Sequence, residues 1–143
     1  MLAKGLTPIL NVSNIQESFA WFEKLGWKKG WGWGTPPTFG GACSGACEIF
    51  LCEGTQGGRG KSRLATTKED DGADKGVWMS IWVDDVDAMH GHCVAQGIEV
   101  TMPPTDEPWG VREMHVRHPD GHVFRISRAV RKRNRRRLAA KGS

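Results

Sequence analysis

A chain of 143 residues has the length of one ordinary domain and can bury a core without help from disulfides or metal ions. It contains no run of about 18 apolar residues that could span a membrane, and its first residues lack the apolar stretch and cleavage site of a secretory signal. We therefore expect a cytoplasmic protein that has no membrane partner.

The net charge of +4 conceals an uneven distribution of charged side chains. Eight of the 20 lysine and arginine residues lie in residues 128–143, where no acidic side chain accompanies them. Residues 1–127 hold the other twelve together with all 16 acidic residues, so this body carries about −4 and the tail about +8. The body and the tail are therefore expected to attract different partners.

The four cysteines match no zinc-binding pattern, because no second CxxC or HxxxH motif accompanies them. Cys43 and Cys47 form a CxxxC motif, which leaves two interpretations open. Free thiols are typical of a reducing compartment, whereas a soft metal or a redox pair would use the two sulfur atoms together.

The first half of the chain predicts a strand, a helix and further strands. Asn14 is placed to cap a helix through IQESFAWFEKL, and Gly26 can end this helix in the left-handed conformation. Strand-like segments follow at WKKGWGW and CEIFLCEG. Residues 55–75 contain almost no large apolar side chain, so we interpret them as a linker.

The second half begins with the segment GVWMSIWV, in which Trp78, Ser80 and Trp82 alternate with apolar residues as in a strand. Asp84 or Asp85 then caps a helix through VDAMHGHCVAQ, which ends near Gly97. Further strands are predicted at IEVTMPP, REMHVRH and HVFRIS, with a tight turn at PDG between the last two.

The two halves repeat one pattern at an offset of 71 residues. LNVSNIQESFAWFEKLGW then lies over IWVDDVDAMHGHCVAQGI, with strand, polar turn, helix and glycine in the same order. Each half therefore reads β-α-β-β-β. We expect an α+β domain over residues 1–127, with unit one at about 5–54, unit two at 76–127, and a basic tail at 128–143.

With this repeat, the sequence resembles the vicinal oxygen chelate superfamily, which includes glyoxalase I, extradiol dioxygenases, fosfomycin-modifying enzymes and bleomycin-resistance proteins. The residues that carry the resemblance are TPILNVSNIQESFAWFEKLGW, FLCEG, SIWVDDVDAMHGHCVAQG and PWGVREMHVRHPDGHVFRIS. The resemblance implies that two βαβββ units curl into a cupped, incomplete barrel, the glyoxalase/bleomycin-resistance fold. It also implies a homodimer.

Enzymes of this superfamily bind one divalent metal through the first and last strands of each unit. The resemblance places these ligand positions on Thr7, Trp78, Arg125 and a residue at or near Glu48. Indole offers no donor to a cation and guanidinium repels one, so only Glu48 is suited to a metal. A weaker alternative is a metal site built from Glu48, Glu113 and His115, since the last two share a strand face.

Indole side chains at these positions are suited to stacking a flat or cationic molecule. We expect a ligand to be bound by residues on the predicted strands and loops of both units: Trp33, Glu48, Trp78, Trp82, Trp109, His115 and Arg125. Trp21 and Trp27 are expected in the core, and His118 and His122 are expected in solvent beside the PDG turn.

Two interpretations of Arg125 remain open, since it either binds the ligand or pairs with Glu48. The tail also has two interpretations. It either keeps the protein in solution or makes nonspecific contact with nucleic acid, because it has basic residues but no aromatic side chain for stacking.

The function predicted from these residues is metal-independent binding and sequestration of a small flat or cationic molecule, without catalysis or a cofactor, as the resemblance to bleomycin-type antibiotic resistance implies. The alternative is a lyase or dioxygenase that uses one divalent metal.

Overall fold

The computed structural model describes residues 1–54 and 76–130. The predicted linker at 55–75 and the tail from residue 131 onward lie outside the described residues. The chain divides into two compact units. The first runs to Val77, and the second begins at Trp78 and does not include residues 119–121. No helix in the described ranges is both long and apolar enough to cross a membrane.

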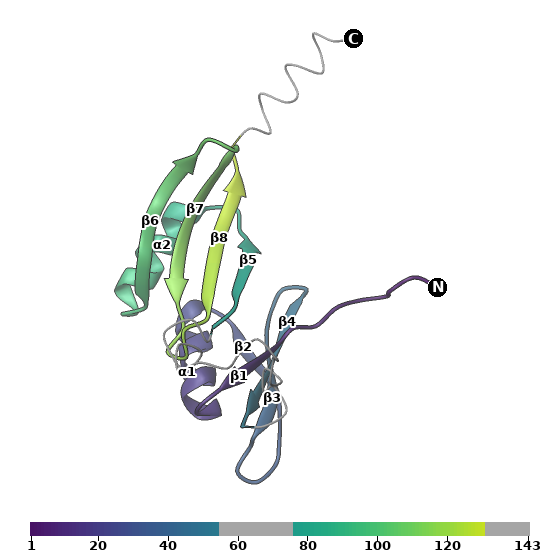
Figure 1. Cartoon of the computed structure of the whole chain (residues 1–143). Coiled ribbons are helices and arrows are strands. Elements are labelled where there is room, and N and C mark those ends of the chain that lie inside the picture. Colours follow the sequence, from purple (N-terminus) through teal and green to yellow (C-terminus); the bar gives the residue numbers. More distant parts are fainter. Residues whose placement is uncertain (55–75, 131–143) are drawn as a thin grey trace, which may run out of the picture. The chain divides into compact units, whose positions relative to one another are not determined.

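The first unit has one helix and a four-stranded sheet (Figure 1). Its elements are β1 (Ile9–Val12), α1 (Ile15–Leu25), β2 (Lys28–Trp33), β3 (Phe39–Ser44) and β4 (Cys47–Glu53). The strand order is β1-β4-β3-β2, in which β1 pairs with β4 in parallel and the other pairs are antiparallel.

The second unit repeats this topology. Its elements are β5 (Trp78–Trp82), α2 (Val86–Ala95), β6 (Glu99–Glu107), β7 (Val111–Arg117) and β8 (Val123–Ala129). The strand order is β5-β8-β7-β6, again with a parallel first pair. The predicted α+β class with two βαβββ units is therefore confirmed.

Capping residues fix the start of each helix at the predicted positions. The Asn14 side chain accepts a hydrogen bond from the Glu17 backbone N–H at 3.0 Å, and Asp85 accepts one from Ala88 at 3.0 Å. Gly26 ends α1 with a φ of 102°, a left-handed conformation that costs glycine little. Of the two candidates for capping α2, the structure selects Asp85.

The core of each unit lies between its helix and its sheet. Buried α1 side chains, including those of Phe19 and Phe22, pack on this side of the first sheet. Trp21 and Trp27 are only 8% and 7% exposed, which confirms that they belong to the core. In the second unit, the corresponding buried side chains are Val86, Cys93, Met114, Val116, Phe124 and Ile126.

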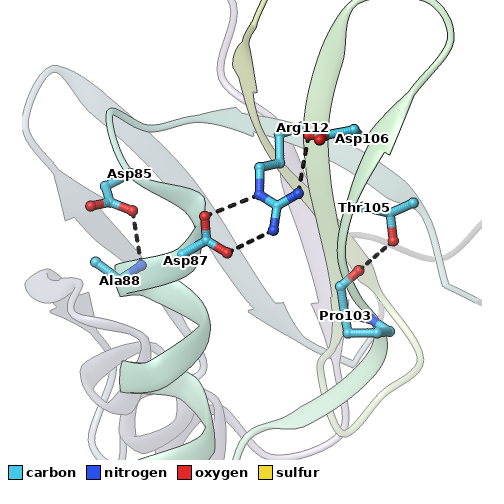
Figure 2. Close-up of polar contacts among 7 residues, drawn as sticks. All are labelled: Asp85, Asp87, Ala88, Pro103, Thr105, Asp106 and Arg112. Atoms are coloured by element: carbon cyan, nitrogen blue, oxygen red, sulfur yellow. Dashed lines mark hydrogen bonds and ion pairs between the residues drawn. The ribbon is translucent and has the colours of Figure 1, made fainter.

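Arg112 attaches α2 to the sheet of the second unit (Figure 2). Its guanidinium on β7 donates to both carboxylate oxygens of Asp87, in the first turn of α2, at 3.0 and 2.9 Å. It also donates to Asp106 on β6 at 3.0 Å. The neighbouring guanidinium lowers the pKa of the Asp87 carboxyl through these hydrogen bonds. One side chain thus joins a helix and two strands.

Three local expectations need correction. The strand β3 has the sequence FGGACS, and its two glycines conceal the apolar alternation that would have located it. The strand β6 continues past its prolines to Glu107, with register shifts on both sides of Met102. His118 and His122 are buried, with 1% and 4% exposure, so the expectation that they lie in solvent was wrong.

Candidate ligand-binding site

The alternation of β5 places Trp78, Ser80 and Trp82 on one face of the second sheet, as the sequence predicted. This face is open, because the side chains of Trp78 and Trp82 are 58% and 65% exposed. The intervening residues, Met79 and Ile81, are partly buried on the other face, where α2 lies. The open face of the second unit therefore presents two indole rings from a single strand.

The neighbouring strands add charged side chains to this open face. Arg125 on β8 lies opposite Ser80 on β5 and opposite His115 on β7. The Arg125 Nε forms an ion pair with Glu113 Oε2 at 2.9 Å, and His115 Nε2 lies 2.9 Å from the same oxygen. Glu113 is 1% exposed, so its carboxylate is buried beneath these two partners. We call Glu113, His115 and Arg125 the charged triad.

Trp78 and the charged triad adjoin a small cavity of about 280 Å³, lined by Trp78, Met79, Ser80 and Arg125. The Trp78 ring meets the His115 ring edge to face, with centroids 5.0 Å apart. The guanidinium carbon of Arg125 lies 6.0 Å from the centroid of the Trp78 ring. The cavity thus has an aromatic wall and a cationic wall.

Ser127 completes this face of the sheet. In the register it lies opposite Trp82 on one side and Glu113 on the other. Its side chain is 2% exposed, and the hydroxyl Oγ has no hydrogen-bond partner within the described residues. Buried hydroxyl groups are nearly always satisfied, so a bound water or another group outside the described residues is expected to pair with this oxygen. Sequence reasoning missed Ser127, because nothing in the segment RIS at residues 125–127 indicates that its hydroxyl group lacks a partner.

The corresponding face of the first unit is filled by packed aromatic rings. Trp31 lies 5.3 Å from Phe39 and 5.2 Å from Phe50, measured between ring centroids. The Trp31 indole N–H donates to Glu48 Oε2 at 3.1 Å. Glu48, a predicted ligand contact, therefore holds a core-like ring in place. Trp33 lies at the end of β2 with 69% exposure.

The remaining predicted site residue, Trp109, lies in the turn between β6 and β7 and is 60% exposed. Gly110 follows it with a φ of 92°, a conformation that suits glycine at this turn. Neither Trp82 nor Trp109 lines the cavity, and Trp82 instead extends the exposed face along β5. Of the predicted ligand contacts, the structure brings together Trp78, His115 and Arg125.

The positions of metal ligands in related enzymes do not carry suitable donors here. The strand registers pair Ile9 with Phe50 and Ser80 with Arg125, so the first-unit counterpart of Arg125 is Phe50 rather than Glu48. The four positions thus hold threonine, phenylalanine, tryptophan and arginine. His115 and Glu113 are bound to each other, and the described residues contain no group of three His, Cys, Asp or Glu arranged for a metal ion. These side chains do not fit a divalent metal.

Arg125 forms an ion pair with Glu113 on the neighbouring strand. The sequence singled out both residues but did not pair them, because a cross-strand partner depends on the register. No disulfide joins the four cysteines, all of which lie in the described residues. Cys43 lies opposite Glu48 and Cys47 opposite Ser44, so their side chains point to opposite faces of the hairpin.

A family model described as the Glyoxalase/Bleomycin resistance protein/Dioxygenase superfamily matches residues 5–126. No curated protein sequence matches the chain. A solved structure of a glyoxalase/bleomycin resistance protein/dioxygenase from Nocardioides is 18% identical, with a TM-score of 0.66, and the match covers 92% of this chain and 88% of that chain.

Two further structures are similar in fold. A bleomycin resistance determinant encoded on the transposon Tn5 is 18% identical with a TM-score of 0.64, and the match covers 89% of this chain and 98% of that chain. A bleomycin-binding protein complexed with bleomycin is 18% identical with a TM-score of 0.63, with 88% and 98% covered. At these identities the likeness establishes the fold and not the ligand.

Proposed function

Since this chain belongs to the glyoxalase/bleomycin resistance protein/dioxygenase superfamily, we propose that it binds and sequesters a small flat molecule without a metal ion and without catalysis. One observation carries the proposal. Trp78 and Arg125, at two positions where related enzymes carry metal ligands, form walls of the same cavity. A site of this composition can stack a ring and hold a polar group, but it offers no Lewis acid for a reaction.

The fold supports a binding role, because the bleomycin-binding protein of similar structure holds a small molecule. A sequestering protein needs affinity alone, so it tolerates the replacement of metal ligands by side chains that contact the ligand directly. The homodimer remains a prediction, which light scattering on the purified protein checks. Nucleic-acid binding through the basic tail also remains a prediction.

The first test is the metal content of protein purified without an affinity tag, combined with thermal unfolding after addition of zinc, nickel, manganese or iron(II). We expect no stoichiometric metal and no stabilisation. About one equivalent of metal with a rise in the unfolding temperature would instead support the lyase or dioxygenase alternative.

The second test is binding of planar aromatic compounds, measured by quenching of tryptophan fluorescence and by calorimetry. Trp78→Leu is expected to weaken binding by about 1–3 kcal/mol, the usual value of one stacking contact. Trp33→Leu is the matched control, because Trp33 is similarly exposed, at 69% against 58%, but does not line the cavity. Equal losses in both variants would remove Trp78 from the site.

A further inference from the structure

We infer that the flat molecule carries an anionic group, most simply a carboxylate, and that Arg125 binds this group. The inference rests on the proposed function and specifies its ligand. It follows from the donors that Arg125 leaves free, from the charge that faces the cavity, and from the unpaired hydroxyl nearby.

The charged triad uses only part of the guanidinium of Arg125. The Nε atom is the one that forms the ion pair with Glu113, while no ion pair or hydrogen bond joins the two terminal nitrogens to residues 1–54 and 76–130. The Arg125 side chain is 44% exposed and lines the cavity. A guanidinium presents five N–H donors in one plane, and its free edge matches the two oxygens of a carboxylate.

The charge at the cavity wall has one sign. Arg125 is the only ionisable residue among the four that line the cavity. Glu113, which balances Arg125, is 1% exposed and lies beneath its two partners. An incoming ligand would therefore meet the cation first. A ligand ammonium group would be repelled by Arg125, which already stands 6.0 Å from the Trp78 ring where a cation would otherwise bind.

Hydroxyl groups near Arg125 also favour an anionic ligand. Ser80 lies opposite Arg125 and lines the cavity. Ser127 lies on the same face of β8, two residues further along, with its buried Oγ unpaired among the described residues. A hydroxyl donates readily to an oxyanion, either directly or through one bound water. The anion would then be held by charge from Arg125 and by a hydrogen bond from Ser80, which is the serine that lines the cavity.

The dimensions of the cavity limit the aromatic part of the ligand. About 280 Å³ lies just below the usual range for small-molecule sites, which runs from roughly 300 to 1,000 Å³. The edge-to-face contact with His115 favours one orientation of the Trp78 ring before a ligand arrives. A compound of about two fused rings with one acidic group therefore suits the site.

The test uses three probes that share one ring system and differ in charge: naphthalene-2-carboxylate, naphthalene-2-carboxamide and 2-(aminomethyl)naphthalene. Calorimetry on the full chain at neutral pH gives their affinities. We expect the carboxylate to bind at least about 10-fold more tightly than the amide, and the amine to bind most weakly. Arg125→Gln is expected to abolish the preference for the carboxylate.

Two variants serve as controls. Arg128→Gln removes the same charge from the same strand but, by alternation, from the opposite face, so it should leave the preference unchanged. Glu113→Gln with Arg125→Gln removes the ion pair without leaving a buried charge, which guards against misfolding of the single variant. The folded double variant should also lose the preference.

The possible failures are distinguishable. Equal affinity for the carboxylate and the amide, or tighter binding of the amine, would overturn the inference and leave the proposed function standing. A preference that persists in the folded double variant would remove Arg125 from its assigned role and also overturn the inference. Binding of none of the three probes would overturn the proposed function, and the inference with it.

Discussion

Glu113 and Arg125 form an ion pair at 2.9 Å across neighbouring strands, in which the carboxylate is buried and the guanidinium is 44% exposed. The two residues therefore have unequal roles. Glu113 holds the arginine in one orientation, while the exposed part of the arginine remains available to a ligand. We therefore expect the loss of Glu113 and the loss of Arg125 to have different consequences for folding and for ligand binding.

The first prediction concerns the stability of this pair. Arg125→Gln leaves the Glu113 carboxylate with His115 as its only described partner, so we expect the free energy of unfolding to fall by about 1–3 kcal/mol. The double variant Glu113→Gln with Arg125→Gln should lose less than the sum of the two single variants. Urea unfolding of the four proteins measures this coupling. If the losses of the two single variants simply add up to the loss of the double variant, the ion pair contributes nothing to the stability of the fold.

The second prediction concerns pH. The pKa of Asp87 is lowered in the folded protein, chiefly by its hydrogen bond from Arg112. A lowered pKa stabilises the fold above the unfolded-state value of about 3.9, and this contribution is lost as the pH falls through the folded-state value. The stability difference between the wild type and Asp87→Asn should therefore be largest near neutral pH and disappear in strong acid.

Asp84→Asn is the control for this experiment, because Asp84 lies just before the N-cap of α2 and has no ion pair within the described residues. A stability difference that stays constant between pH 7 and strong acid would show that the Asp87 charge is irrelevant. Thermal unfolding across the pH range provides the measurement.

The third prediction concerns three glycines. A Cβ at Gly40 would lie 2.6 Å from Phe19 Cζ and 2.7 Å from the Trp31 carbonyl oxygen, which belongs to the backbone and cannot easily move. Gly40→Ala should therefore cost about 1–3 kcal/mol of stability. Gly41→Ala would displace the indole of Trp31 from Glu48, so its effect should appear as a change in tryptophan fluorescence as well.

Gly91 provides the opposite case. It lies inside α2, and a Cβ there would meet nothing within 4 Å. Gly91→Ala should stabilise the protein by roughly 0.5–1 kcal/mol, because alanine favours the helix. A destabilised Gly91→Ala protein, or a Gly40→Ala protein of unchanged stability, would contradict the packing described here.

The fourth prediction concerns thiol reactivity. Cys47 is exposed, whereas Cys93 is fully buried and burial raises the pKa of its thiol. Cys47 should therefore react first with a thiol reagent in the native protein, and Cys93 only after unfolding. Mass spectrometry of partly labelled protein identifies the order. Early labelling of Cys93 would show that α2 opens readily in the native state.

The sequence predicted the elements whose determinants are local. The caps at Asn14 and Asp85, the glycine at residue 26 and the repeat of the two halves are each specified by a few neighbouring residues. The charged triad was not predicted as a unit, although all three of its residues had been singled out. Its contacts depend on which residues of β7 and β8 face each other, and a register shift of one residue would separate them.

The aromatic filling of the first unit was also missed, for a related reason. The ring of Trp31 fits against the sheet because Gly41 has no side chain, and Phe39 and Phe50 come from other strands. A glycine that makes room for a distant indole looks, in the sequence, like a glycine that interrupts a strand. Composition therefore indicated aromatic side chains without showing that those of the first unit pack on each other.

The parallel pairing of β5 with β8 has a consequence for the order in which the protein acquires its activity. Trp78 opens the second unit, and Arg125 lies on its last strand, so the two walls of the cavity are far apart in the sequence. Such non-local pairing requires a long loop of chain to close, which slows folding. A nascent chain on the ribosome lacks the cavity until residues 123–129 have emerged, and the ligand can then bind only to molecules whose final strand has docked.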